Sequence, residues 1–371
     1  MASRFEARLV IVGRALLRRA FGGRRKKPAA PRRILIAHHL LLGDTLMLTP
    51  LVAKLRARHP DAEIVMTVPR AFAPLYAHRP YALRALAWDP RDRASVRELL
   101  AEPAFDLAFV PGDNRHAWLA QAMGARWIVA FAGDRPAYKS WPVDELRAYP
   151  SAPASWYDMT AMLADGPAPD PFADSDWGVP EPVETSVPPL PPSPYAVLHV
   201  GASARLKLWP SPHWRALAAE LRARGFRIVW SAGSSETQLV DACAPDPADI
   251  VTAGRLDLAQ MFSMLRNAAL LVAPDTGVAH LGRIAGAPTV ALFGPGSALL
   301  AGHGDFWRTA RYRALTIAPF PCRDQHVLFK RDVAWVSICK RAFEECGRPR
   351  CMEALDVTRV LAAFEEMSVR S

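Results

Sequence analysis

A proline-rich stretch divides this chain and limits what it can fold into. Residues 166–194 contain ten prolines in 29 positions. Proline has a fixed φ and no backbone N–H, so this density excludes a long helix or a central strand. We therefore expect a semi-rigid linker at 166–194, with one domain at 32–165 and a second at 195–355.

Short apolar runs alternate with helical patterns on both sides of this linker, as is typical of α/β domains with parallel sheets. In the first domain, strands are expected at 34–37, 64–68, 107–110 and 127–131. In the second, they are expected at 195–200, 227–231, 269–272, 289–293 and 315–317. A helix over 357–367 is predicted within a final segment, 356–371.

Positive charge is concentrated at the N-terminus. The net charge is +10 and the pI about 9.7. Eleven of the basic residues fall in the first 33 positions with a single acidic residue, and the rest of the chain is neutral overall. The basic character thus belongs to a tail, residues 1–31, and does not indicate a nucleic-acid-binding domain.

This tail has the pattern of an amphipathic helix over residues 4–21. Its arginines fall on one arc and most of its apolar side chains on the other, and a basic cluster follows at 24–27. Such a segment suits an anionic membrane surface, although packing on the protein's own surface is the alternative. No signal peptide or membrane-spanning run is recognised, so we expect a cytoplasmic protein, peripheral on the inner face of the cytoplasmic membrane.

The stretch 273–295 has the pattern of a strand, a tight turn, a helix and a second strand. The turn contains Asp275, Thr276 and Gly277, and His280 follows within the helix. Free N–H groups at a helix N-terminus attract anions, and such turns bind nucleotides and phosphates in open α/β sheets. The alternative is a capped helix without a ligand. His280 taken alone is more typical of a structural histidine.

Three further turns follow predicted strands. Asp44, after the first strand, is a candidate general base or a helix cap. The loop with Gly201, Ser203 and Lys207 offers backbone, hydroxyl and ammonium donors for phosphate, or is a basic surface loop. Glu236, after the next strand, could bind ribose hydroxyls or serve as a helix-start acid.

Three ordered segments resemble the bacterial glycosyltransferase family 9, best known for the ADP-heptose:lipopolysaccharide heptosyltransferases. They read LLGDTLMLTPLVAKLRARHPDAEI, VLHVGASARLKLWPSPHWRALAAELRARG and APDTGVAHLGRIAGAPTVALFGP, and the likeness covers residues 32–365. The resemblance implies a GT-B fold, with two Rossmann-like domains facing across a cleft. The N-terminal domain would hold a glycolipid or glycan acceptor, and the C-terminal domain a nucleotide sugar, expected to be ADP-heptose.

The resemblance also implies roles for individual residues in an inverting transfer that needs no cofactor. Asp44 would be the general base, and Lys207 would neutralise the leaving diphosphate. The residues expected to contact the donor are Gly201, Ser203, Lys207, Glu236, Asp275, Thr276, Gly277 and His280. Two other functions stay open. One is a nucleotide-sugar epimerase of the same fold, and the other is a degenerate nucleotide-sugar-binding protein tethered to the membrane.

Four of the five cysteines lie close together near the C-terminus: Cys322, Cys339, Cys346 and Cys351. Disulfides are not expected in a reducing cytoplasm. The four thiols could hold a structural zinc or iron ion, but no Cys-x-x-Cys pair is present. Free thiols in a packed subdomain are the alternative, and Cys243, which stands apart, is expected to be inert.

Overall fold

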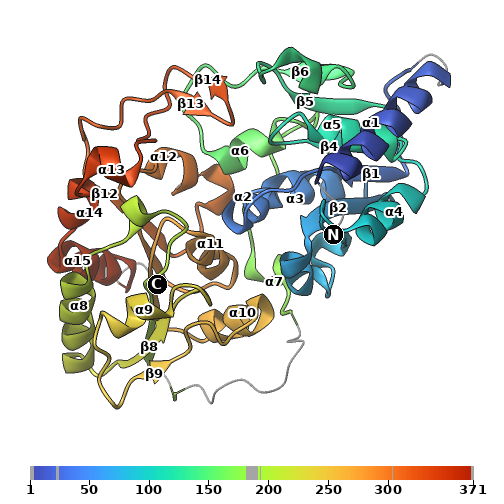
Figure 1. Cartoon of the computed structure of the whole chain (residues 1–371). Coiled ribbons are helices and arrows are strands. Elements are labelled where there is room, and N and C mark those ends of the chain that lie inside the picture. The colour runs from blue at the N-terminus through green and yellow to red at the C-terminus, as the bar shows by residue number, and fades with distance from the viewer. Residues whose placement is uncertain (1–3, 22–24, 181–190, 193, 303, 369–371) are drawn as a thin grey trace. The chain divides into compact units, whose positions relative to one another are not determined.

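The computed structural model describes residues 4–21, 25–180, 191–192, 194–302 and 304–368. The chain divides into two compact units (Figure 1). Unit 1 runs up to Asp170 and also includes Val327–Trp335. Unit 2 comprises Pro171–His326 and continues from Val336. A short segment far along the sequence is therefore part of the first unit.

Unit 1 is built on a six-stranded parallel sheet with the order β3-β2-β1-β4-β5-β6. Its strands are β1 (Arg33–Ile36), β2 (Glu63–Pro69), β3 (Leu83–Trp88), β4 (Leu107–Val110), β5 (Ile128–Phe131) and β6 (Glu145–Arg147). This is the Rossmann order, in which the direction of winding reverses between β1 and β4. Ligands of such sheets bind at that reversal, beyond the carboxyl ends of the strands.

The helices of unit 1 precede, connect or follow these strands. They are α1 (Arg4–Phe21), α2 (Leu42–Leu46), α3 (Thr49–Arg58), α4 (Arg93–Ala101), α5 (His116–Ala122), α6 (Trp156–Ala161) and the 3-10 turns η1 (Arg70–Tyr76), η2 (Pro80–Ala82) and η3 (Ala137–Ser140). The apolar residues between positions 45 and 59 have the spacing of one helix, but the chain forms α2 and α3 instead. Pro50 lies in the first turn of α3, where its missing N–H is tolerated, so a new helix begins there.

Helix α1 is part of unit 1 and packs against α5. Ala7, Ile11 and Ala15 enter the same buried cluster as α5 and the sheet. Ile11 lies outside the apolar stripe of the amphipathic pattern, yet it is one of the residues that bury. The helix therefore docks through two alanines and Ile11, and not through the apolar face that the pattern emphasised.

A two-stranded hairpin, β13 (Val327–Leu328) and β14 (Arg331–Asp332), belongs to unit 1 although its sequence neighbours belong to unit 2. Phe329 lies against Trp156, with ring centroids 4.6 Å apart. Trp335 donates its indole N–H to the carbonyl of Pro150 at 2.9 Å. Aromatic packing and hydrogen bonding thus attach this hairpin to the first unit.

Unit 2 repeats the same architecture, with a six-stranded parallel sheet in the order β12-β11-β10-β7-β8-β9. Its strands are β7 (Tyr195–His199), β8 (Arg227–Ser231), β9 (Ile250–Val251), β10 (Leu270–Pro274), β11 (Thr289–Phe293) and β12 (Tyr312–Thr316). Counted from β7, this is again the Rossmann order, and the winding reverses between β7 and β10.

The helices of unit 2 cover this sheet. They are α7 (Asp174–Trp177), α8 (Ser211–Ala223), α9 (Thr237–Asp241), α10 (Leu258–Arg266), α11 (Gly277–Ile284), α12 (Ala298–Ala301), α13 (Phe343–Cys346), α14 (Arg350–Glu353), α15 (Val357–Ser368) and the 3-10 turns η4 (Arg205–Lys207) and η5 (Asp305–Trp307). The predicted α/β class with two Rossmann-like domains is confirmed.

Part of the proline-rich stretch is packed. Helix α7 forms in a window without proline, and Trp177 is buried. Phe172 contacts Trp307, with ring centroids 4.4 Å apart. The expectation of a linker thus does not describe these residues, because two large aromatic side chains bury there. Residues 181–190 and 193 lie outside the described part of the chain.

Candidate active site

Three loops meet at the carboxyl edge of the sheet in unit 2. The loop after β7 carries Gly201, Ser203 and Lys207, and the turn after β10 begins at Asp275. Because β7 and β10 are adjacent parallel strands, these two segments leave the sheet side by side at the reversal of winding. The loop after β8, the other neighbour of β7, carries Glu236.

An ion pair joins the first two loops. The ammonium Nζ of Lys207 lies 2.8 Å from Oδ2 of Asp275 and donates to the backbone carbonyl of the same residue at 2.9 Å. Both side chains are partly buried. An ammonium has three N–H donors, so one remains for a ligand. The pair thus holds a cation next to the start of α11.

The N-terminus of α11 is open to a hydrogen-bonding ligand. Thr276 is the N-cap residue, in extended conformation, but its hydroxyl makes no capping bond. Oγ1 of Thr276 is buried and has no hydrogen-bond partner among the described residues. A buried hydroxyl without a partner is uncommon in proteins, and here it lies beside the free N–H groups that begin at Gly277. The capped-helix alternative is therefore disfavoured, and the geometry fits an anion.

Glu236 shapes the neighbouring loop. Its carboxylate accepts hydrogen bonds from the backbone N–H groups of Ala202, at 2.9 Å, and Gly233, at 3.1 Å. A Cβ atom on Gly201 would collide with this carboxylate, so only glycine allows the close approach. Glu236 occupies the N-cap position of α9, as the helix-start alternative expected, but its side chain makes no capping bond there.

His280 and Ser203 lie in different environments. His280, in α11, is buried, and burial followed by the charges of Arg283 and Lys207 holds its pKa well below the usual range. The imidazole is therefore neutral and adds no positive charge to the site. Ser203 is exposed in the loop after β7.

Asp44 lies in unit 1, in the first turn of α2, at the end of the loop that follows β1. The N-cap position of α2 is Leu41, whose side chain cannot accept a hydrogen bond. Asp44 is therefore not the N-cap residue of α2, although its carboxylate lies in the first turn of that helix. Its position near the reversal of winding between β1 and β4 suits a residue that contacts a ligand.

The same loop contains His38, which the sequence analysis did not identify as a candidate site residue. His38 is fully buried after β1, and its Nδ1 accepts a hydrogen bond from the N–H of Leu40 at 3.2 Å. Burial, followed by the neighbouring His116 and His39, lowers the pKa of His38 well below its usual range. The proton of the neutral ring is thus on Nε2, which has no partner among the described residues. The position of His38 directly after a predicted buried strand was the sequence feature that could have identified it as a site residue.

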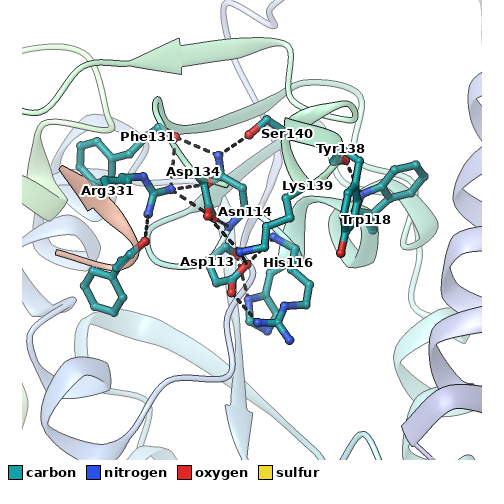
Figure 2. Close-up of polar contacts among 12 residues, drawn as sticks. Asp113, Asn114, His116, Trp118, Phe131, Asp134, Tyr138, Lys139, Ser140 and Arg331 are labelled. Carbon is teal, nitrogen blue, oxygen red and sulfur yellow. Dashed lines mark hydrogen bonds and ion pairs between the residues drawn. The ribbon is translucent and has the colours of Figure 1, made fainter. Parts of the chain in front are cut away.

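A buried network of charges follows β4 and β5 (Figure 2). Lys139 lies 3.1 Å from Asp113 and 2.9 Å from Asp134. Arg331, from the hairpin, donates to Oδ1 of Asn114 at 2.7 Å and lies 3.7 Å from Asp134. Sequence reasoning missed these residues, although Asp113 and Asn114 stand shortly after a predicted strand.

This network supports the loops and does not present an anion site. Each of its cations, Lys139, Arg331 and the more exposed Arg115, is paired with Asp113 or Asp134. Burial alone would raise the pKa of Asp113, but hydrogen bonds from Arg115 and Lys139 outweigh it and hold that pKa well below its usual range. The carboxylate therefore stays ionised and paired.

The cysteines do not form the metal site that their spacing left open. Within the described chain, which includes all four, no three His, Cys, Asp or Glu side chains are arranged to hold a metal ion. The thiols of Cys322 and Cys339 interact, while burial raises the pKa of Cys351 to about 11. Cys243 is likewise buried with a pKa raised to about 11.

Comparison with known proteins is consistent with this geometry. The chain belongs to glycosyltransferase family 9 (heptosyltransferase), whose family model matches residues 93–304. It is 26% identical over 287 residues to lipopolysaccharide heptosyltransferase 1 of Pseudomonas aeruginosa, covering 71% of this chain and 79% of that protein. The protein is thus a glycosyltransferase.

Two solved structures share the fold. ADP-heptose lipopolysaccharide heptosyltransferase II of Escherichia coli has a TM-score of 0.66 at 18% identity, over 91% of this chain and 99% of that one. The iron-containing dodecameric glycosyltransferase TibC of Escherichia coli has a TM-score of 0.57 at 14% identity, over 93% of this chain and 80% of that one. At these identities the likeness concerns the fold alone.

We predict that Arg331→Leu lowers the free energy of unfolding by about 3–5 kcal/mol, because it leaves buried polar partners unpaired. Urea denaturation of the full chain measures this. Arg135→Ala is the matched control, since its ion pair with Asp332 joins the same loop and hairpin at 3.3 Å but is largely exposed. That control should cost no more than about 0.5 kcal/mol. Equal small effects of the two variants would show that the buried network does not anchor the hairpin.

Proposed function

We propose that this protein transfers heptose from ADP-heptose to a lipopolysaccharide-type glycan, with inversion at the anomeric carbon. Membership of the family and the names of the two heptosyltransferases above support this choice of donor and acceptor. The observation that carries it is the Lys207–Asp275 pair at the N-terminus of α11, beside the unpartnered hydroxyl of Thr276.

The donor diphosphate would bind at that helix N-terminus. The N–H groups that begin at Gly277, the hydroxyl of Thr276 and the third N–H of Lys207 are donors suited to phosphate oxygens. Negative charge grows on the diphosphate as its bond to the anomeric carbon breaks. Donors fixed in advance by Asp275 would stabilise that charge without reorganisation. Gly201, Ser203 and Glu236 would line the nucleotide, and His280 would support α11 as a neutral residue.

Asp44 would act on the acceptor as general base. Its carboxylate would take the proton of an acceptor hydroxyl while that oxygen attacks the anomeric carbon from the face opposite the diphosphate. One displacement of this kind inverts the configuration. The reaction is complete when the sugar is on the acceptor oxygen, the proton is on Asp44 and the nucleoside diphosphate leaves.

We place this reaction in the cytoplasm, with the protein peripheral on the inner face of the cytoplasmic membrane. A lipid-linked glycan acceptor would lie at that surface, and the basic α1 suits its charge. No helix of the described chain is both long enough and apolar enough to cross a bilayer.

ADP and ADP-heptose should raise the melting temperature of the purified protein more than UDP, GDP, CMP or their sugars.

Lys207→Met should weaken ADP binding by roughly 10- to 100-fold, the contribution of one hydrogen bond to a charged group. Isothermal titration calorimetry measures this, with the exposed Lys26→Met as the matched control. An unchanged affinity for ADP in Lys207→Met would remove this lysine from the donor site.

Asp44→Asn should lower kcat by roughly 10²–10⁴-fold, the usual contribution of a general base, while ADP affinity is retained. Steady-state transfer assays measure kcat, and Asp61→Asn, at an exposed position in the same unit, is the control. If Asp44→Asn keeps near-normal turnover, the base lies elsewhere.

Removal of divalent metals should leave the transfer rate unchanged, because Lys207 and the N-terminus of α11 supply the positive charge that a metal would otherwise provide. Assays with and without EDTA test this. Loss of activity that returns on adding Mg²⁺ would contradict the proposal that transfer is metal-independent.

A further inference from the structure

Helix α1 has one face that is buried in unit 1 and an opposite face that is exposed. Ala7, Ile11 and Ala15 recur at every fourth position and bury against unit 1, with α5 as a direct neighbour (Figure 1). At about 100° per residue, they define an arc of roughly 80°. The remaining circumference of the helix is available for other contacts.

The opposite face of α1 is apolar and exposed. We call it the outer face, and its members are Leu9, Val10, Leu16, Leu17 and Phe21, which are 52–86% exposed. On the helical wheel these five side chains fall within roughly 140°, away from the buried arc. An amphipathic helix ordinarily buries its apolar side in its own protein, so exposure of this side indicates an external partner.

Positive charge borders the outer face. Arg8 and Arg19 are exposed along one of its edges, and Arg14 lies half-buried along the other. Glu6, the acid of this helix, is paired with Arg93. The basic cluster that follows is less available than the sequence suggested, because Arg25 pairs with Asp144 at 3.0 Å and Lys27 with Glu145 at 2.8 Å. Arg24 lies outside the described residues.

Two large aromatic side chains of unit 1 are also exposed. Tyr138, in η3, and Trp141, directly after it, are 49% and 65% exposed. This segment is tied to α5, the helix on which α1 rests, by the hydrogen bond from the indole of Trp118 to the carbonyl of Tyr138 at 3.1 Å (Figure 2). Tyrosine and tryptophan are favoured at the boundary between lipid and water.

We propose that the outer face of α1 is a membrane-docking surface that inserts into the headgroup region of an anionic lipid bilayer. Leucine, valine and phenylalanine side chains would enter the acyl boundary, and the bordering arginines would contact lipid phosphates. A second copy of the chain fits less well, since its own α1 would bring the same arginines and repel. The proposal rests on the function above, in that it assigns membrane binding to the unit expected to hold the acceptor.

Flotation with phosphatidylethanolamine/phosphatidylglycerol vesicles tests this on the full chain. Replacing Leu16, Leu17 and Phe21 together by serine should lower the bound fraction by at least about tenfold. These side chains are exposed, so the fold should persist. Deletion of the helix is a poorer test, because it also removes Ala7, Ile11 and Ala15 from the core.

The matched control replaces three exposed apolar residues of unit 2, Val179, Val251 and Leu299, by serine. This control should bind vesicles as the unaltered chain does. Neutral phosphatidylcholine vesicles should bind the unaltered chain more weakly, since they lack the charge that the arginines recognise. Equal binding of both triple variants to anionic vesicles would overturn the proposal.

Light scattering tests the remaining alternative, in which the outer face is an interface between two copies of the chain. If the unaltered chain self-associates without binding vesicles, and the α1 variant does not self-associate, the outer face is an interface between copies and the proposal fails. ADP binding by both variants distinguishes this outcome from failure of the proposed function. If the α1 variant loses vesicle binding but still binds ADP, the outer face is the membrane-docking surface and the donor site is intact. If the unaltered chain binds vesicles but not ADP, the proposed donor site is wrong and the membrane-docking proposal stands.

Discussion

The parallel pairing of β7 with β10 is the constraint on which the proposed donor site depends. These strands are far apart in sequence, and the winding of the sheet reverses between them. Parallel strands end at the same edge, so the loop with Lys207 and the turn with Asp275 must emerge together. Their ion pair then places one cation at a helix N-terminus whose N–H groups are unsatisfied. A sheet of different order would separate these groups.

In unit 1, a buried network of paired charges stabilises the loops that follow β4 and β5. Four ionised groups are buried or half-buried there, and a buried charge is tolerated only when it is paired. Arg331 completes this pairing from a hairpin that returns to unit 1 from far along the sequence. The carboxyl edge where the acceptor is expected to bind is therefore supported by a segment outside the continuous first unit.

The proposed donor and acceptor sites thus contain different polar groups. The donor side has fixed positive charge and an unpartnered hydroxyl, which suit a diphosphate. The acceptor side has Asp44 in the first turn of α2 and a neutral His38 with an unpartnered Nε2. Helix α1 adds an apolar surface to the same unit, so that the unit expected to hold a lipid-linked acceptor also carries the outer face.

The sequence by itself determined the fold class, most of the central strands and the loops in which we propose that the donor binds. Strands β4, β8 and β11 were predicted with their observed bounds, because continuous apolar runs ended at polar turns. Strands β3, β6 and β9 were missed, since edge strands are short or half-exposed and lack that pattern. Only the tertiary structure decided the pairing of Lys207 with Asp275, the return of Arg331 across 217 residues to Asn114, and the face through which α1 docks. Local patterns specify which side chains are apolar or charged, but the partner that each one meets depends on strand order and on contacts between distant segments.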